Sequence, residues 1–130
     1  MFTLRAGLNY WQATMFFKKR AIKRYMSVLP AKLAKDYGGG SYYTIGQILT
    51  AIDACGLSKK YRQYAVAMFI DPEDLKQTFE MSFSAYEGME VRREIADMFF
   101  DGEVEFVLRN GRSSQNGNPG TDPFPGGTND

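Results

Sequence analysis

Hydrophobic and polar positions between residues 9 and 29 repeat with the period of an α-helix. At about 100° per residue, one side of this helix is apolar and carries Trp11, Met15, Ile22, Tyr25, Met26 and Leu29. The opposite side is basic and carries Lys19, Arg20, Lys23 and Arg24. Phe16 falls within the basic side, and Lys18 falls among the apolar residues. The pattern therefore predicts an amphipathic helix with one basic face.

Pro30 is predicted to divide this region into two helices. Proline disfavours helical geometry in the residue before it, so the first helix is expected to end at Leu29. Pro30 then begins a second, short helix over residues 31–36, which the glycines after Tyr37 terminate. Residues 1–8 are weakly patterned and are expected to be frayed or extended.

Four further helices are predicted after the glycines. Thr44 and Gln47 have the spacing of a capping box, and Gly56 supplies the stop signal of the helix that they begin. Ser58 is the expected cap of the next helix, which runs to Phe69.

Asp71 and Pro72 predict the start of another helix, because an aspartate cap followed by proline favours the first turn. A final helix is expected over residues 84–100. Together the apolar stripes predict one core, made of Ile48, Leu49, Ile52, Tyr64, Met68, Phe79, Ile95 and Phe99.

The C-terminal part has a different composition. Alternation of apolar and polar residues over 103–109 predicts a short strand or an extended arm. Residues 110–130 are mostly Gly, Asn, Ser, Pro and Asp, which cannot bury enough surface to offset the entropy of ordering. We therefore predict an all-α fold: a single helical domain over residues 1–109, built as a compact bundle of about five short helices, and a disordered tail over 110–130.

The composition argues against catalysis and metal binding. The chain has no histidine, which is the commonest general acid–base group and metal ligand, and its single cysteine, Cys55, lies on an apolar stripe. The acidic residues lack the spacing of a calcium loop. We therefore expect no catalytic residues, no cofactor and no metal site. With no membrane-spanning run and no secretory signal, we expect a cytoplasmic protein.

The glycine-rich segment 38–40 does not match a phosphate-binding loop, because no Gly-Lys-Ser/Thr follows it. Three tyrosines flank it: Tyr37, Tyr42 and Tyr43. Tyrosine offers apolar contact area with a polar tip, so these residues are a candidate aromatic interface. The alternative is that they seal the edge of the core.

Charge is sorted along the chain. Residues 1–36 hold eight basic residues and one acid, Asp36, whereas residues 71–105 hold eleven acids and three bases. The basic face, with Phe16, Lys19, Arg20, Lys23 and Arg24 as its candidate binding residues, has several interpretations. The two preferred interpretations are that the basic face is simply solvated, or that it pairs internally with the acidic half of the chain. Otherwise it binds anionic membrane or nucleic-acid phosphates, or a protein partner.

The chain also resembles a small bacterial family of uncharacterised helical proteins. The segments that carry the resemblance lie within residues 17–100. They are Phe17-Lys18-Lys19-Arg20-Ala21-Ile22, Leu29-Pro30, Tyr37-Gly38, Tyr43-Thr44-x-x-Gln47, Gly56-Leu57, Tyr64-Ala65-Val66-Ala67-Met68-Phe69, Tyr86 and Arg92-Arg93-Glu94. The resemblance implies a cytoplasmic helical protein and supplies no functional residues.

The sequence thus predicts a non-enzymatic interaction or regulatory module. The rival hypothesis is a peripheral binder of anionic surfaces that works through residues 16–24. The opposed charge poles also permit head-to-tail self-association, which would weaken as salt screens the charges.

Overall fold

The computed structural model describes residues 2–109 and 112–113 of the 130-residue chain, with the side chains of residues 12–108. The described part contains five helices and one small hairpin. The elements are α1 (Phe2–Tyr37), α2 (Ile45–Ala54), α3 (Arg62–Phe69), α4 (Pro72–Ser82), α5 (Gly88–Phe99), β1 (Leu108–Arg109) and β2 (Arg112–Ser113). The predicted all-α class and the number of helices are confirmed.

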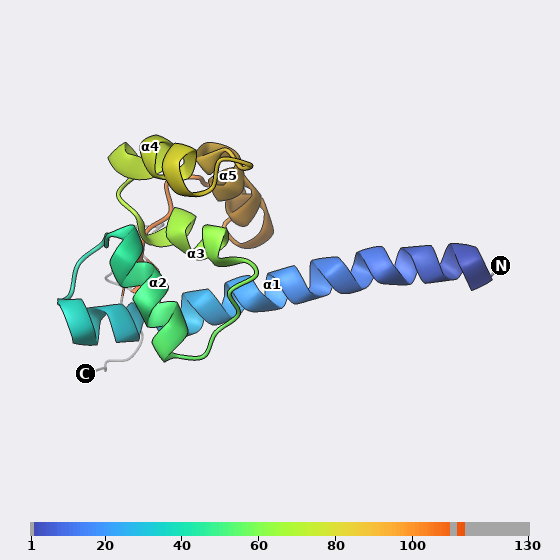
Figure 1. The fold of residues 1–130 in the computed structure, drawn as a ribbon, viewed down its shortest axis with the longest axis horizontal. Coiled ribbons are helices and arrows are strands. Elements are labelled where there is room, and N and C mark those ends of the chain that lie inside the picture. Colours follow the sequence, from blue (N-terminus) through green and yellow to red (C-terminus); the bar gives the residue numbers. More distant parts are fainter. Residues whose placement is uncertain (1, 110–111, 114–130) are drawn as a thin grey trace.

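Helix α1 is not short, and it is packed over only part of its length. Figure 1 shows its N-terminal half extending away from the body formed by the other helices. Its buried residues begin at Ala21, and none of residues 12–20 is buried. The buried set consists of Ala21, Ile22, Tyr25, Leu29, Pro30 and Leu33. The expectation that residues 1–8 are frayed or extended is wrong from Phe2 onward, since the helix begins there.

The predicted break at Leu29-Pro30 is also wrong, because α1 runs through Pro30 without interruption. A proline inside a helix costs about 3 kcal/mol. Leu29 and Leu33 flank it and are fully buried, so a break would remove two large side chains from the core. Burial of these side chains outweighs the lost backbone hydrogen bond.

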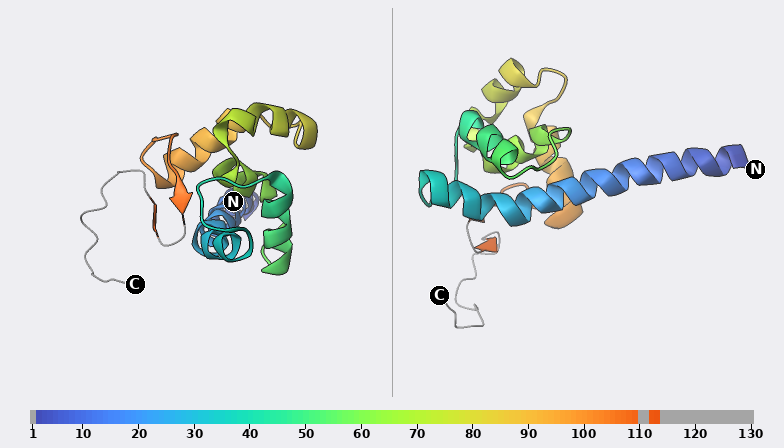
Figure 2. Two further views of the ribbon diagram at one scale, coloured as in Figure 1. Left: turned by 90° about the vertical axis from the view of Figure 1, so that its left-hand side faces the viewer. Right: turned by 60° about the horizontal axis from the view of Figure 1, so that its bottom comes forward.

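Helix α3 lies at the centre of the bundle. Every residue from Gln63 to Phe69 is buried, and α1, α2 and α5 all contact this helix. Figure 2 shows the surrounding helices from two sides. The predicted core residues are all buried except Leu49 and Phe99, which are half-buried. The predicted list left out the α1 residues and Phe106, which is fully buried.

Two predicted helix starts are confirmed in detail. The Gln47 amide donates to Thr44 Oγ1 at 3.1 Å, and the Thr44 amide donates to Gln47 Oε1 at 3.0 Å, which completes the capping box. The Glu73 amide donates to Asp71 Oδ1 at 2.9 Å, and Pro72 is the first residue of α4. Local chemistry alone was sufficient at both positions.

Two other helix starts are corrected. Helix α3 begins at Arg62 rather than after Ser58, whose hydroxyl instead accepts from the Lys60 amide at 3.3 Å within a turn. Helix α5 begins at Gly88 rather than at residue 84. A Cβ atom at Gly88 would lie only 2.7 Å from Cγ of Leu75, so α5 begins where its backbone meets α4 closely.

Arg92 fixes the C-terminal segment against the bundle. Its side chain is 4% exposed and donates to the carbonyl oxygens of Val104 at 2.7 Å and Ala67 at 2.9 Å, and also to that of Phe106. The guanidinium carbon lies 3.9 Å from the centroid of the Phe106 ring. Burial lowers the pKa of Arg92. The guanidinium therefore joins α5 to α3 and to the segment 104–106.

The predicted strand over 103–109 is reduced to Leu108–Arg109, which pairs antiparallel with Arg112–Ser113. These last two residues belong to the segment predicted as a disordered tail. The rest of that predicted tail lies outside the described residues.

Candidate functional site

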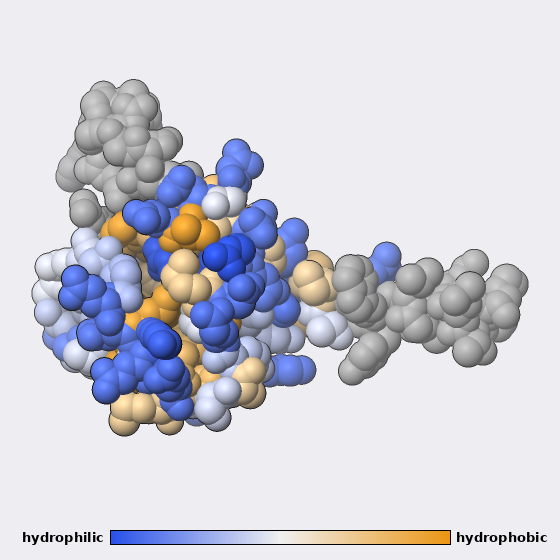
Figure 3. All heavy atoms as spheres, turned by 90° about the horizontal axis from the view of Figure 1, so that it is seen from above, coloured by the Kyte–Doolittle hydropathy of each residue, from blue (hydrophilic) through white to orange (hydrophobic). Residues whose placement is uncertain are grey.

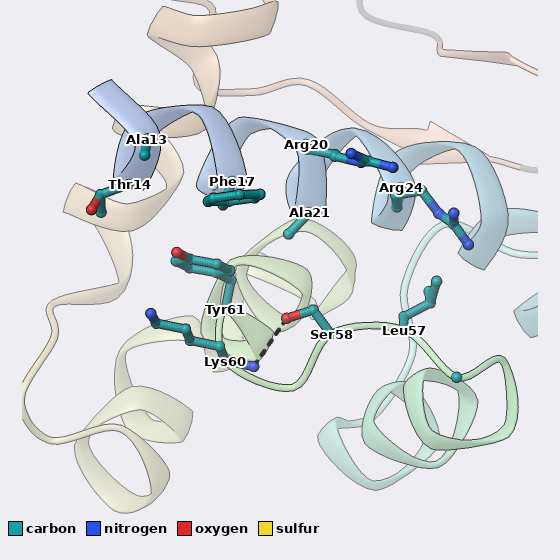
Figure 4. A pocket seen from close by; sticks show the side chains of 11 residues that line it. Ala13, Thr14, Phe17, Arg20, Ala21, Arg24, Leu57, Ser58, Lys60 and Tyr61 are labelled. Carbon is teal, nitrogen blue, oxygen red and sulfur yellow. Dashed lines mark hydrogen bonds between the residues drawn. The ribbon is translucent and has the colours of Figure 1, made fainter. Parts of the chain in front are cut away.

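A groove of about 580 Å³ separates α1 from the connection between α2 and α3 (Figure 4). Helix α1 and residues 56–61 form its two walls. The lining residues are Ala13, Thr14, Phe17, Arg20, Ala21, Arg24, Gly56, Leu57, Ser58, Lys60 and Tyr61. Its volume falls in the range of small-molecule sites, which is roughly 300–1,000 Å³.

The floor of the groove is apolar. Ala21, Leu57 and Tyr61 are each at most 9% exposed, and the Phe17 ring points toward the Tyr61 ring across the groove (Figure 4). Phe17 itself is 55% exposed. An apolar group in the groove would therefore contact aromatic and aliphatic carbon on both walls.

Two features hold the connection 56–61 in place beside α1. Gly56 adopts a φ of 66°, a left-handed conformation that favours glycine. The Tyr25 hydroxyl, on the buried side of α1, donates to the carbonyl oxygen of Ser58. Burial raises the pKa of Tyr25 to about 12, so its hydroxyl stays protonated near neutral pH and continues to donate.

The charged residues that line the groove are all basic. Arg20 and Arg24 lie one helical turn apart on α1, and Lys60 lies on the opposite wall, with its Nζ 5.6 Å from the centroid of the Tyr61 ring. Within the described residues, none of the three takes part in an ion pair. Guanidinium groups bind phosphate and carboxylate through paired hydrogen bonds, so the groove has the chemistry of an anion site with an apolar floor.

The structure divides the predicted basic face into two flanks. Arg20 and Arg24 line the groove, whereas Lys19 and Lys23 do not. All four are exposed and make no ion pair within the described part of the chain.

The two phenylalanines beside these cations are divided in the same way. Phe17 lines the groove and Phe16 lies outside it. Both rings are more than half exposed, at 57% for Phe16 and 55% for Phe17, and their centroids lie 5.4 Å apart. Each flank of α1 therefore carries one exposed aromatic ring and two cations.

Internal pairing between the basic and acidic halves is present, but it involves Lys18. Its Nζ lies 2.8 Å from Glu94 Oε2, and the Tyr64 hydroxyl donates to Glu94 Oε1 at 2.7 Å. Burial alone would lower the pKa of Lys18, but hydrogen bonds with Glu94 and Tyr64 outweigh it and raise the pKa. Lys18 was not among the candidate residues, so its ion pair leaves the candidate cations available.

The acidic pole is a separate surface on α5. A groove of about 460 Å³ is lined there by Tyr64, Ala85, Tyr86, Glu87, Glu90, Val91, Arg93, Glu94 and Asp97. Arg93 pairs with Glu90 at 2.8 Å. No group of acidic or cysteine side chains in the described residues could hold a metal ion. Figure 3, viewed from the side of α4 and α5, shows mostly hydrophilic residues with apolar ones between them.

The predicted tyrosine interface is brought together only in part. Tyr42 and Tyr43 line a groove of about 400 Å³ beside α4, together with Met81, which is 77% exposed. The Tyr43 hydroxyl donates to the carbonyl oxygen of Gly38 at 2.8 Å. Tyr37 does not line this groove.

Sequence reasoning missed one wall of the groove on α1. Lys60 and Tyr61 were assigned only to a helix after Ser58, and no sequence signal placed them beside α1.

A family model matches residues 13–130. The chain belongs to DUF6559, a family of unknown function. The resemblance to an uncharacterised family is thereby confirmed. The DUF6559 match begins at Ala13, the first residue that lines the groove, so it takes in both walls. Comparisons with curated proteins and with solved structures find no match. None of the described helices combines the length and the apolarity needed to cross a bilayer.

Proposed function

We propose that this member of DUF6559 is a non-catalytic binding module that attaches to anionic membrane surfaces through residues 16–24 of α1. One observation carries the proposal. Four exposed cations, which make no ion pair with any residue that the structure describes, lie beside two exposed phenylalanines, on and next to the part of α1 that the body does not bury. Helices that lie on membranes combine cations for the lipid headgroups with aromatic side chains that enter the interface.

The charges contribute to reversible attachment. A basic residue close to an anionic leaflet contributes about 1 kcal/mol, so the four cations together contribute about 4 kcal/mol. Among residues 12–108, no acidic side chain is paired with Lys19, Arg20, Lys23 or Arg24, so no such pair has to be broken first. Partial insertion of Phe16 and Phe17 adds a hydrophobic contribution that salt does not screen.

A membrane fits these residues better than a nucleic acid does. One exposed ring lies on each flank of the basic face. Both rings can therefore enter the membrane interface while the cations contact the lipid headgroups. The sequence pI of about 7.8 argues against tight binding to nucleic acid through charge alone, and a membrane adds the insertion of Phe16 and Phe17 to the charge. Binding to duplex DNA or RNA is therefore treated as an outcome of the test rather than as the proposal.

Other predicted partners remain predictions. The exposed Met81 in the groove of Tyr42 and Tyr43 favours a second candidate, a protein partner at that surface. Self-association through the opposed charge poles, a cytoplasmic location and the absence of catalysis are likewise still to be tested.

Vesicle co-sedimentation tests the proposal directly. The full chain should sediment with phosphatidylcholine vesicles that contain phosphatidylglycerol, and not with phosphatidylcholine alone. Replacing Lys19, Arg20, Lys23 and Arg24 with Gln should abolish sedimentation and leave the melting temperature unchanged. Added salt should weaken binding by the wild-type chain.

Lys76 provides the matched control, since its side chain is 88% exposed on α4, away from the basic face. Lys23→Gln should weaken vesicle binding about fivefold, whereas Lys76→Gln should have no effect. Unchanged binding by the quadruple variant would refute the proposal. So would binding to duplex nucleic acid without binding to vesicles. A large fall in melting temperature would show that the basic face is paired internally.

A further inference from the structure

We infer that the groove between α1 and residues 56–61 holds the phosphodiester of a single anionic phospholipid, with Arg20 and Arg24 on the phosphate. This inference rests on the proposed function, because the groove opens beside the residues proposed to meet the membrane. It adds to that function a defined lipid subsite, whereas the rest of the basic face acts only through its charge.

The two arginines are placed to share one phosphate. Residues four apart on a helix have their Cβ atoms about 5–6 Å apart, and both side chains line the same groove. A phosphodiester has two non-bridging oxygens, and each can accept hydrogen bonds from a guanidinium. In the part of the chain that the structure describes, no carboxylate lines the groove to compete with the phosphate.

Lys60 adds a cation from the other wall. It belongs to the connection 56–61 rather than to α1, and Figure 4 shows it on the wall opposite α1, with its amine directed toward the end of the groove away from the arginines. An anion in the groove would therefore be attracted from two separate elements. A plain basic helix face lacks this arrangement and attracts phosphates from one side only.

The floor accounts for the lipid rather than a free phosphate. Ala21, Leu57 and Tyr61 form a nearly buried apolar surface next to the arginines, and Phe17 covers it from α1. The glycerol and the first acyl carbons of a phospholipid would contact this surface. Inorganic phosphate or glycerol 3-phosphate would leave the Phe17 ring, which is 55% exposed, open to water and should bind more weakly.

The flanks of α1 supply an internal control. Arg20 and Arg24 line the groove, while Lys19 and Lys23 carry the same charge on the same helix and lie outside it. Attraction by charge alone treats the two pairs alike. A phospholipid subsite in the groove depends on the arginine pair and not on the lysine pair.

The experiment is a calorimetric titration of the full chain with dihexanoylphosphatidylglycerol below its critical micelle concentration. The Arg20→Gln/Arg24→Gln variant should bind this soluble lipid at least about tenfold more weakly than wild type. The Lys19→Gln/Lys23→Gln variant should bind it as wild type does. Glycerol 3-phosphate should bind to wild type and to both double variants much more weakly than the soluble lipid binds to wild type.

Ser58→Trp provides a second test that does not alter the charge. Ser58 is exposed and lines the groove, so an indole at this position should occupy the space of the lipid. Binding of the soluble lipid should then be lost, while vesicle attachment through the charges should remain. Retention of soluble-lipid binding by this variant would overturn the inference.

Several results separate failure of the site from failure of the proposed function. The subsite is refuted and the surface attachment stands if the protein binds vesicles but not the soluble lipid. The same conclusion follows if both double variants lose soluble-lipid binding equally. If the soluble lipid binds to the groove but vesicles do not, the subsite stands and the attachment fails. A salt-sensitive dimer that the Arg20→Gln/Arg24→Gln variant abolishes would place a second copy in the groove and refute the subsite.

Discussion

The two halves of α1 have the same secondary structure and different surroundings. From Ala21 to Leu33 one face of the helix is buried against α2 and α3, whereas residues 12–20 have no buried position. The apolar and aromatic character of the helix continues past the body into this second stretch, with Met15, Phe16 and Phe17. Periodicity therefore identifies a helix and its apolar face without identifying what covers that face. From Ala21 to Leu33 that face is covered by the rest of the chain. Along residues 16–24 it is the opposite, basic side of the helix that we propose meets a membrane.

The largest contrast between the two halves should appear in stability. Leu29→Ala removes a fully buried side chain and should lower the free energy of unfolding by about 2–5 kcal/mol. Phe17→Ala removes a larger side chain that is 55% exposed, and it should change the free energy of unfolding by less than about 0.5 kcal/mol. Urea denaturation measures both. Equal losses would show that residues 12–20 belong to the folded core.

A smaller effect is expected when the exposed aromatic residues are removed from the membrane surface. Each ring is already partly covered, so insertion of Phe16 and Phe17 together should contribute about 2 kcal/mol, or about thirtyfold in affinity. The Phe16→Ser/Phe17→Ser variant should therefore weaken vesicle binding and leave its salt dependence unchanged. Met81→Ser on α4 removes another exposed apolar side chain and should have no effect. If both variants weaken vesicle binding equally, α1 is not the inserting element.

The smallest effect concerns Lys18, where the exposed half of α1 meets the body. Lys18→Met should destabilise the fold by about 0.5–1 kcal/mol near neutral pH, since the pair with Glu94 is partly open to solvent. The folded-state pKa values of Lys18 and Tyr64 are both raised, that of Tyr64 to about 12 through burial and its bond to Glu94. Stability from these groups is therefore fully present below about pH 10 and is lost as the pH rises toward 12.

Melting curves of wild type and Lys18→Met across this pH range measure the effect. The difference between the two proteins should shrink as the pH rises. A constant difference would mean that Lys18 stabilises the fold through its aliphatic stem and not through its charge.

The sequence predicted those parts of the fold that depend on neighbours along the chain. The capping box at Thr44 and the start of α4 at Asp71 were correct, because their partners lie within three residues. The break at Pro30 was wrong because burial of Leu29 and Leu33 decides the outcome there. The structural role of Arg92 was not predicted, since its carbonyl acceptors lie 12 to 25 residues away and leave no local pattern.

The candidate site was predictable to a similar extent. The cations and Phe16 follow from helical periodicity, and the structure places all of them on the surface. Their division into a groove flank and an outer flank depends on where residues 56–61 pass α1. That position is set by the hydroxyl of Tyr25 and the left-handed turn at Gly56, neither of which the basic pattern reveals.

The continuity of α1 has a consequence for how the protein is oriented. Residues 12–29 contain neither proline nor glycine, and Pro30 lies within the packed half, so the exposed half joins the bundle without a flexible joint. A surface that holds the exposed half of α1 in one orientation also fixes the tilt and rotation of the helical bundle. The acid-rich side of α5 would then face one set direction, available to a second molecule while the first remains attached.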